Sequence, residues 1–147
     1  MTDELSKPSE MNGISKHLGV VLTQFGNGTA SFTVVVNDIH LNKGGVAFGG
    51  LHASLLDSAM GGALVSTLKI SEWCATANLT INYLEGSLPG AELIATGKIV
   101  RRGRNLAHLS GEIRDGHGTL HANATGVWNI WSSKPTQFQQ IINSDDS

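Results

Sequence analysis

The sequence has a single cysteine, Cys74, and few aromatic residues, which make up 5% of its 147 positions. One cysteine excludes an intramolecular disulfide and a thiolate metal cluster, and the six dispersed histidines show no metal-ligand spacing. A strong charge is also missing, because the formal net charge of −2 favours neither nucleic acid nor an anionic membrane. No apolar run reaches the roughly 18 residues of a membrane span, and the polar first residues are unlike a signal peptide. We therefore expect a cytoplasmic protein without a metal, nucleic-acid or membrane partner.

The length and the composition predict one domain with polar ends. A chain of 147 residues is long enough for one hydrophobic core and short for two. The first 12 residues and residues 132–147 are polar, so we place the folded domain at residues 13–131 and expect the ends to be partly disordered or to pack as short additions.

One carboxylate, Asp57, lies alone in the longest uncharged stretch, residues 44–68. Apolar residues recur there at three- and four-residue steps, which predicts a helix with a broad buried face that begins at Gly49. A buried carboxylate costs several kcal/mol unless it is paired, hydrated or placed at a cavity. Asp57 is therefore a candidate for chemistry, and the alternative is a structural hydrogen bond to Ser54 or Ser58 or a subunit contact.

Strand patterns dominate the rest of the chain. The segments expected as strands are residues 17–24, 29–36, 74–84, 91–101, 106–114 and 119–131. In the third of these segments, strict alternation puts Thr76 on the same face as Asn78, Thr80 and Asn82, opposite Leu79, Ile81 and Tyr83. Two strands, a long helix and four strands with short connections predict an α+β domain. Its architecture is the hot-dog fold, in which an antiparallel sheet wraps around one long central helix.

The motif around the helix start resembles that of a known enzyme family. Asn42, Gly45, Gly49 and Asp57 have the spacing typical of hot-dog thioesterases related to the phenylacetate-pathway (PaaI-like) acyl-CoA thioesterases. The resemblance implies hydrolysis of a CoA thioester with no cofactor beyond the coenzyme A of the substrate. It also implies a dimer or a dimer of dimers, because the family's site lies between two subunits, with Asp57 of one subunit facing Gly49 of the other.

The resemblance and the chemistry of the reaction together assign roles to individual residues. Asp57 would be the general base or the nucleophile, and the Gly49 backbone N–H at the positive end of the helix would stabilise the oxyanion. Gly50 would let the substrate approach the main chain closely. Asn42 and Thr76 would orient the attacking water or the carbonyl. The coenzyme A phosphates would be bound by Arg101, Arg102 and Arg104.

The sequence departs from the family at Phe48, where relatives have histidine. Phe48 makes the entrance of the site more apolar and is a candidate contact for the acyl group. The departure leaves two further functions open, a non-catalytic acyl-CoA sensor and, less favoured, a hot-dog dehydratase or hydratase, which needs a histidine paired with an acid.

Other residues have simpler interpretations. The arginines are equally compatible with a solvated hairpin tip. His52 is expected on the helix surface or at an interface, His108 and His121 on polar strand faces, and Cys74 in the core. No serine lies in a nucleophile-elbow context, so a Ser-His-Asp arrangement is not expected.

Overall fold

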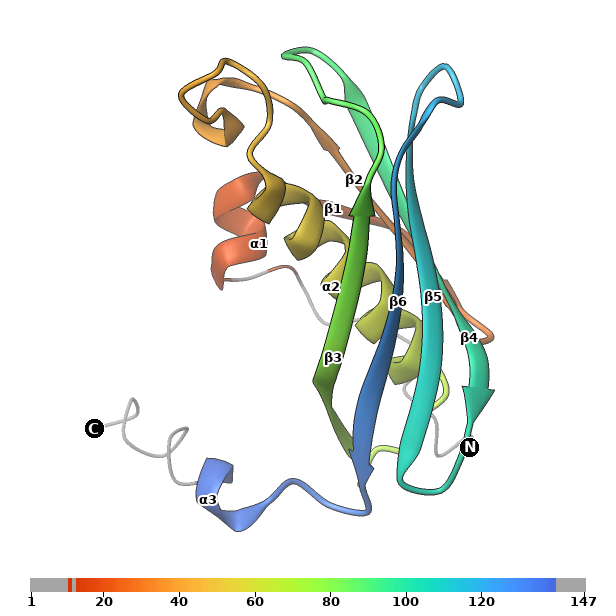
Figure 1. The fold of residues 1–147 in the computed structure, drawn as a ribbon. Coiled ribbons are helices and arrows are strands. Elements are labelled where there is room, and N and C mark those ends of the chain that lie inside the picture. Colours follow the sequence, from red (N-terminus) through yellow and green to blue (C-terminus); the bar gives the residue numbers. More distant parts are fainter. Residues whose placement is uncertain (1–10, 12, 140–147) are drawn as a thin grey trace, which may run out of the picture.

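The computed structural model describes residue 11 and residues 13–139, and Figure 1 shows a long helix lying along one side of a twisted sheet. The elements are α1 (Gly13–Leu18), β1 (Val21–Gly26), β2 (Thr29–Val35), the 3₁₀ helix η1 (Asp38–His40), α2 (Gly49–Val65), β3 (Trp73–Tyr83), β4 (Glu92–Arg102), β5 (Leu106–Asp115), β6 (Leu120–Trp131) and α3 (Thr136–Gln139).

The six strands form one antiparallel sheet in the order β1-β2-β4-β5-β6-β3. The predicted hot-dog fold is confirmed, and α2 begins at Gly49 as expected. The first predicted strand was wrong at its start, because His17 and Leu18 belong to α1. This short helix ends at Gly19, whose φ of 75° stops a helix without steric cost, and β1 follows two residues later.

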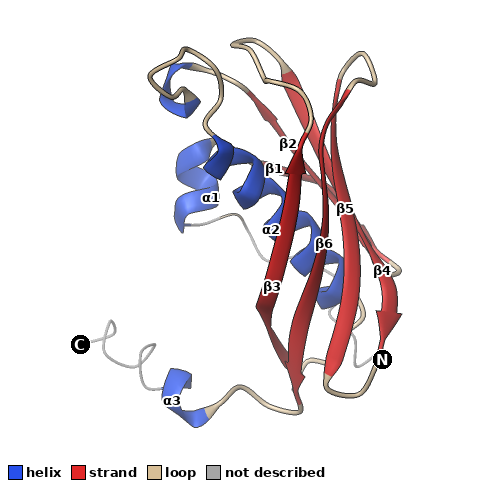
Figure 2. Cartoon of the chain, in the orientation of Figure 1, coloured by secondary structure: helices blue, strands red, loops and turns tan. Residues whose placement is uncertain are grey.

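The core lies between α2 and the sheet, and Figure 2 shows this helix lying along one face of the strands. The buried residues of α2 are Leu51, His52, Leu55, Leu56, Ala59, Met60, Ala63 and Leu64. Each fully buried leucine among them contributes about 1.5–3 kcal/mol of transfer free energy. Gly97 of β4 and Gly111 of β5 face this helix, and a Cβ at Gly97 would collide with the backbone of Ala59 and Met60. Glycine at this position therefore allows α2 to lie directly on the sheet.

Strand β3 is an edge strand of the sheet and contains an irregularity near its start. Its pairing with β6 shifts register between Thr76 and Asn78, so that Ala77 is an extra residue. The strict alternation predicted for this strand was therefore wrong at Thr76. Thr76 points to the side of the sheet that α2 covers and bonds to Asp57 of that helix.

The ends of the chain are described only in part. Of the polar segments predicted at residues 1–12 and 132–147, residues 1–10, 12 and 140–147 lie outside the described part of the structure. Within the C-terminal segment, α3 brings the Phe138 ring onto Trp73 with the ring centroids 5.3 Å apart.

Candidate active site

Asp57 lies on the side of α2 that the sheet leaves exposed. Its Oδ1 accepts a hydrogen bond of 2.6 Å from the Thr76 hydroxyl of β3. The alternative bond from Ser54 is not formed, because the Ser54 hydroxyl donates to the Gly50 carbonyl. The helix places the carboxylate at the surface of the subunit, and the irregularity in β3 turns Thr76 toward it.

Gly49 is the first residue of α2 and follows Phe48, which is the N-cap residue. The phenyl side chain has no acceptor for the backbone N–H groups of the first turn, and none of the hydrogen bonds of the described residues uses the Gly49 N–H. The Tyr83 hydroxyl at the end of β3 donates to the Gly49 carbonyl at 2.7 Å. The half-exposed Phe48 ring covers Gly50, where a Cβ would overlap it. The helix start thus presents an N–H group, together with the helix dipole, toward a ligand.

Asn42 lies in the loop before α2, and its side-chain oxygen binds backbone within that loop. It accepts from the N–H groups of Gly44 at 2.8 Å and Val46 at 3.4 Å. The structure therefore does not join Asn42 to Asp57 or to Gly49 by a hydrogen bond.

The three arginines lie at the turn between β4 and β5, and the structure separates them into two groups. Arg101 and Arg104 are exposed. Arg102 instead donates to the Thr67 carbonyl at 2.8 Å and forms a bidentate ion pair with Glu72 at 3.0 and 2.8 Å. The pKa of Glu72 is lowered, mainly by the backbone N–H of Lys69 and further by Arg102. Arg102 fixes the segment after α2, whereas the other two are open to a ligand.

A buried polar chain is the part of the molecule that sequence reasoning missed. The His52 Nε2 lies 2.8 Å from the Ser87 Oγ, which lies 2.9 Å from the His121 Nδ1, and the His121 Nε2 lies 2.8 Å from the Asp115 Oδ2. His52 and His121 are each 3% exposed and Ser87 is fully buried, so the positions predicted for these two histidines were wrong, whereas His108 is exposed as expected. Ser87, His121 and Asp115 form a Ser-His-Asp arrangement without a nucleophile elbow, which was not expected. The position of His52 among the leucines of α2 was the sequence signal that could have indicated its burial.

His52 and Ser87 also line a pocket of about 270 Å³ next to the helix start. Gly49 and Tyr83 line the same pocket. Burial lowers the pKa of His52, with a further decrease from His121 and an opposing increase from the Phe48 backbone carbonyl. The missed residues therefore lie directly behind the candidate oxyanion donor.

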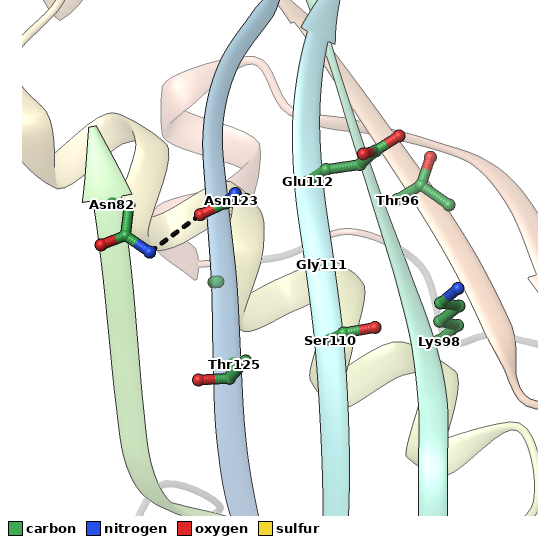
Figure 3. A pocket seen from close by; sticks show the side chains of 9 residues that line it. Asn82, Thr96, Lys98, Ser110, Gly111, Glu112, Asn123 and Thr125 are labelled. Carbon is green, nitrogen blue, oxygen red and sulfur yellow. Dashed lines mark hydrogen bonds between the residues drawn. The ribbon is translucent and has the colours of Figure 1, made fainter. Parts of the chain in front are cut away.

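A larger groove of about 600 Å³ lies on the opposite face of the sheet (Figure 3). Most of its side chains are polar, and a hydrogen bond of 2.9 Å joins two of them, Asn82 and Asn123. None of the site residues predicted from the sequence lines this groove.

Residue 11 and residues 13–139 contain neither a metal-ligand cluster nor a membrane-spanning helix. No group of three or more His, Cys, Asp or Glu side chains there is arranged to hold a metal ion. None of the helices in this part of the chain has the length and apolar character needed to cross a membrane.

Two bacterial proteins of known structure have folds similar to that of this chain. The PaaI protein of the Escherichia coli phenylacetic acid degradation operon has a TM-score of 0.74 and 25% identity, with 79% of this chain and 82% of that chain covered. A Streptococcus mutans protein solved with bound acetyl CoA has a TM-score of 0.72 and 26% identity, with 79% and 91% covered.

Sequence comparisons identify the family to which the chain belongs. A Saccharolobus solfataricus protein named as an esterase is 30% identical over 132 residues, which are 90% of this chain and 91% of that protein. Mouse acyl-coenzyme A thioesterase 13 is 33% identical over 75 residues, which are 51% of this chain and 53% of that protein. The family model of the thioesterase superfamily matches residues 44–122. The chain therefore belongs to the thioesterase superfamily and is a thioester hydrolase.

Proposed function

We propose that the protein hydrolyses acyl-CoA thioesters at a site shared by two subunits. The observation that carries this proposal is that both halves of the candidate site are bonded to the same edge strand, β3. Asp57 is bonded to Thr76 near the start of β3, and Gly49 is bonded to Tyr83 at its end. The mouse relative named as an acyl-CoA thioesterase and the acetyl-CoA complex of the Streptococcus mutans protein support the substrate class.

One subunit alone does not provide the site. Asp57 follows Gly49 by eight residues on α2, which corresponds to about 12 Å along the helix axis. A thioester carbonyl bound to the Gly49 N–H is therefore too far from the Asp57 carboxylate of the same chain.

The free edge of β3 offers a second copy of the chain as the solution. This edge strand has 11 residues and pairs only with β6 among the described strands. Long unpaired edges favour association with another strand. If two copies of β3 pair antiparallel about a twofold axis between Leu79 and Thr80, Thr76 of one copy lies opposite Tyr83 of the other. Asp57 of one subunit then approaches Gly49 of its partner, and the proposed assembly is a dimer or a dimer of dimers.

The proposed reaction uses water and the substrate without a further cofactor. The thioester oxygen binds the Gly49 N–H, where the helix dipole stabilises the negative charge that develops. Asp57 either takes a proton from the attacking water or attacks the carbonyl carbon itself, and Thr76 orients its carboxylate. With water as the nucleophile, a C–O bond forms, the C–S bond breaks, and the proton taken by Asp57 passes to the coenzyme A thiolate. With Asp57 as the nucleophile, the C–S bond breaks as a mixed anhydride forms on Asp57, and water then hydrolyses this anhydride. Both routes give a carboxylic acid and coenzyme A.

Substrate contacts are assigned more broadly. Phe48 and Gly50 would contact the acyl group at the helix start, and the exposed Arg101 and Arg104 would bind coenzyme A phosphates. Arg102 would support their turn through its contact with Glu72. Asn42 would shape the loop before α2 through its bonds to backbone.

The test of the oxyanion donor compares Gly49→Pro with Gly49→Ala. Proline is tolerated at the first position of a helix but has no N–H, and Phe48 already has the extended conformation (φ −70°, ψ 149°) that precedes proline. Both variants place a Cβ 3.2 Å from the Tyr83 hydroxyl, so they differ in the N–H group. We expect Gly49→Pro to lose about 10²–10³-fold in kcat and Gly49→Ala to retain most activity. Equal rates in the two variants would contradict the proposed donor.

The shared site is tested by mixing subunits. Asp57→Asn should reduce kcat at least about a hundredfold while the protein stays folded. A mixed dimer of Asp57→Asn and Gly49→Pro chains keeps one intact site, because each chain supplies the group that the other lacks. Mixed dimers should therefore recover activity across a panel of short-, medium-, long-chain and aromatic acyl-CoAs. Mixed dimers that remain inactive would refute the shared site, and wild-type binding without turnover would favour an acyl-CoA sensor.

A further inference from the structure

The hydrogen-bonded chain of His52, Ser87, His121 and Asp115, which is buried except at Asp115, joins three other parts of the fold to the start of α2. Asp115 ends β5, His121 is in β6, Ser87 is in the connection from β3 to β4, and His52 is in the first turns of α2. The Ser87 carbonyl also accepts from the Ala47 N–H at 2.8 Å, two residues before Gly49. The chain thus connects a distant hairpin turn to the proposed oxyanion donor.

The hydrogen bonds of the chain have a direction set by Asp115. The pKa of Asp115 is lowered, first by its bond to His121 and also by the N–H groups of His117 and Thr119, so it is a carboxylate and accepts only. The His121 Nε2 therefore carries a hydrogen. In a neutral ring the His121 Nδ1 then accepts from the Ser87 hydroxyl, whose oxygen accepts from the His52 Nε2–H.

This direction leaves the His52 Nδ1 without a hydrogen. That nitrogen is buried and has no hydrogen-bond partner among the residues that the structure describes. The Phe48 carbonyl is the backbone group that acts on His52 from the preceding turn. While His121 is neutral, the His52 Nδ1 has no hydrogen to donate to that carbonyl, which accepts from the Leu51 N–H at 3.0 Å.

Protonation of His121 reverses the direction of these hydrogen bonds. Both His121 nitrogens then donate, so the Ser87 hydroxyl turns and donates to the His52 Nε2. The hydrogen of His52 moves to Nδ1, next to the Phe48 carbonyl. Ser87 can make this change because a hydroxyl both donates and accepts. The ionisable groups that line the pocket together with His52 are Tyr83 at the end of β3 and Glu85, and Asp57 lies further along α2.

We propose that Ser87 is a positioning residue of the thioesterase site, which sets the tautomer of His52 according to the protonation of His121. The proposal rests on the proposed role of Gly49. His52 contacts the Tyr83 ring edge-on, with the centroids 5.6 Å apart and the planes at 81°, and Tyr83 holds the Gly49 carbonyl. A change at Ser87 is therefore transmitted through His52 to both sides of the first turn of α2.

The direct test is a ¹⁵N NMR measurement of the histidine rings of the full-length protein as the pH is lowered. We expect His52 to carry its hydrogen on Nε2 at the higher pH and to change to Nδ1 as His121 gains a proton. In Ser87→Ala the two rings should become independent, whereas Ser87→Thr keeps the hydroxyl and should restore the coupling. A His52 tautomer that stays constant while His121 titrates in the wild-type protein would overturn the proposal without any variant.

The kinetic test separates positioning from packing. Ser87→Ala should lower kcat about tenfold through misplacement of the helix start, change KM less than twofold and alter the acidic limb of the kcat profile. Ser110→Ala, on the distant groove, is the matched control and should leave the profile unchanged. An unaltered acidic limb in a folded Ser87→Ala protein would refute the positioning role. If Gly49→Pro is as active as Gly49→Ala, the proposed role of Gly49 as oxyanion donor fails, and the NMR result still decides whether the rings are coupled.

Discussion

The contact between Gly97 and α2 predicts that a single methyl group will displace the helix that carries Asp57. A Cβ at Gly97 would lie 2.6 Å from the Met60 backbone nitrogen, and ordinary contact begins at 3.4 Å. The helix and the strand must therefore separate by at least about 0.8 Å in Gly97→Ala, the difference between those two distances, because the Ala59 carbonyl group lies closer still. Backbone cannot change rotamer to avoid the collision, so the displacement reaches Asp57, three residues before Met60.

The matched control is Gly111→Ala on the neighbouring strand. Gly111 pairs directly with Gly97 between β4 and β5. A Cβ at Gly111 would meet the Cγ and Sδ atoms of Met60 at 2.9 Å, and a flexible side chain can move away. The two substitutions are chemically identical and change the unfolded chain in the same way.

The difference should appear in stability and in turnover. Overpacking costs about 1–3 kcal/mol, and we expect the upper half of that range for Gly97→Ala and less than about 1 kcal/mol for Gly111→Ala. At about 2–4 °C per kcal/mol for a chain of this size, Tm should fall about 4–12 °C in Gly97→Ala. A displacement near 1 Å can cost about a hundredfold in rate, so its kcat should fall at least about tenfold.

Thermal unfolding and steady-state hydrolysis are measured at one fixed protein concentration, because self-association raises Tm. The reasoning is refuted if both variants lose the same stability, or if Gly97→Ala unfolds earlier but keeps wild-type kcat.

Two further predictions concern single ionisable groups. The pKa of Glu72 is lowered from its ordinary value of 4.5, so its contribution to stability is present above that pH and is lost as the pH falls through the lowered pKa. The Tm difference between wild type and Glu72→Gln should therefore shrink from pH 7 toward about pH 3, and a constant difference would contradict the assignment. Burial raises the pKa of Cys74 to about 11, so about one thiol in a thousand is ionised at pH 8. Iodoacetamide should modify it on the order of a hundredfold more slowly than a cysteine peptide until the protein is unfolded; equal rates would place the thiol at the surface.

The long elements of the fold were predictable because burial repeats along them. The apolar period of α2 and the alternation in β6 each extend over more than ten residues, so the pattern outweighs any single position. Helix α1 has six residues and none of them is buried, so it has no period to detect. The register shift at Ala77 was equally hidden, because nothing in the local sequence marks an extra residue in the pairing with β6.

In the candidate site too, features within one element could be predicted and contacts between elements could not. Gly49 and Asp57 lie on one helix, so their spacing can be read from the chain. The bond from Thr76 to Asp57 depends on how a strand meets that helix. The hydrogen-bonded chain of His52, Ser87, His121 and Asp115 could not be predicted from local sequence patterns. A histidine such as His52 is stable in the core only with a partner, and its partner Ser87 is 35 positions away.

The phenyl side chain at the N-cap of α2 shows where stability and activity compete in this protein. A serine or aspartate at position 48 would accept a hydrogen bond from the first turn and stabilise the helix by about 1 kcal/mol. It would also place a permanent acceptor beside the Gly49 N–H, where a substrate oxygen has to bind only transiently. Proteins need to exceed a stability threshold rather than reach a maximum. With Phe48 the helix is less stable than it would be with a capping serine or aspartate at this position, and the Gly49 N–H remains available to the ligand.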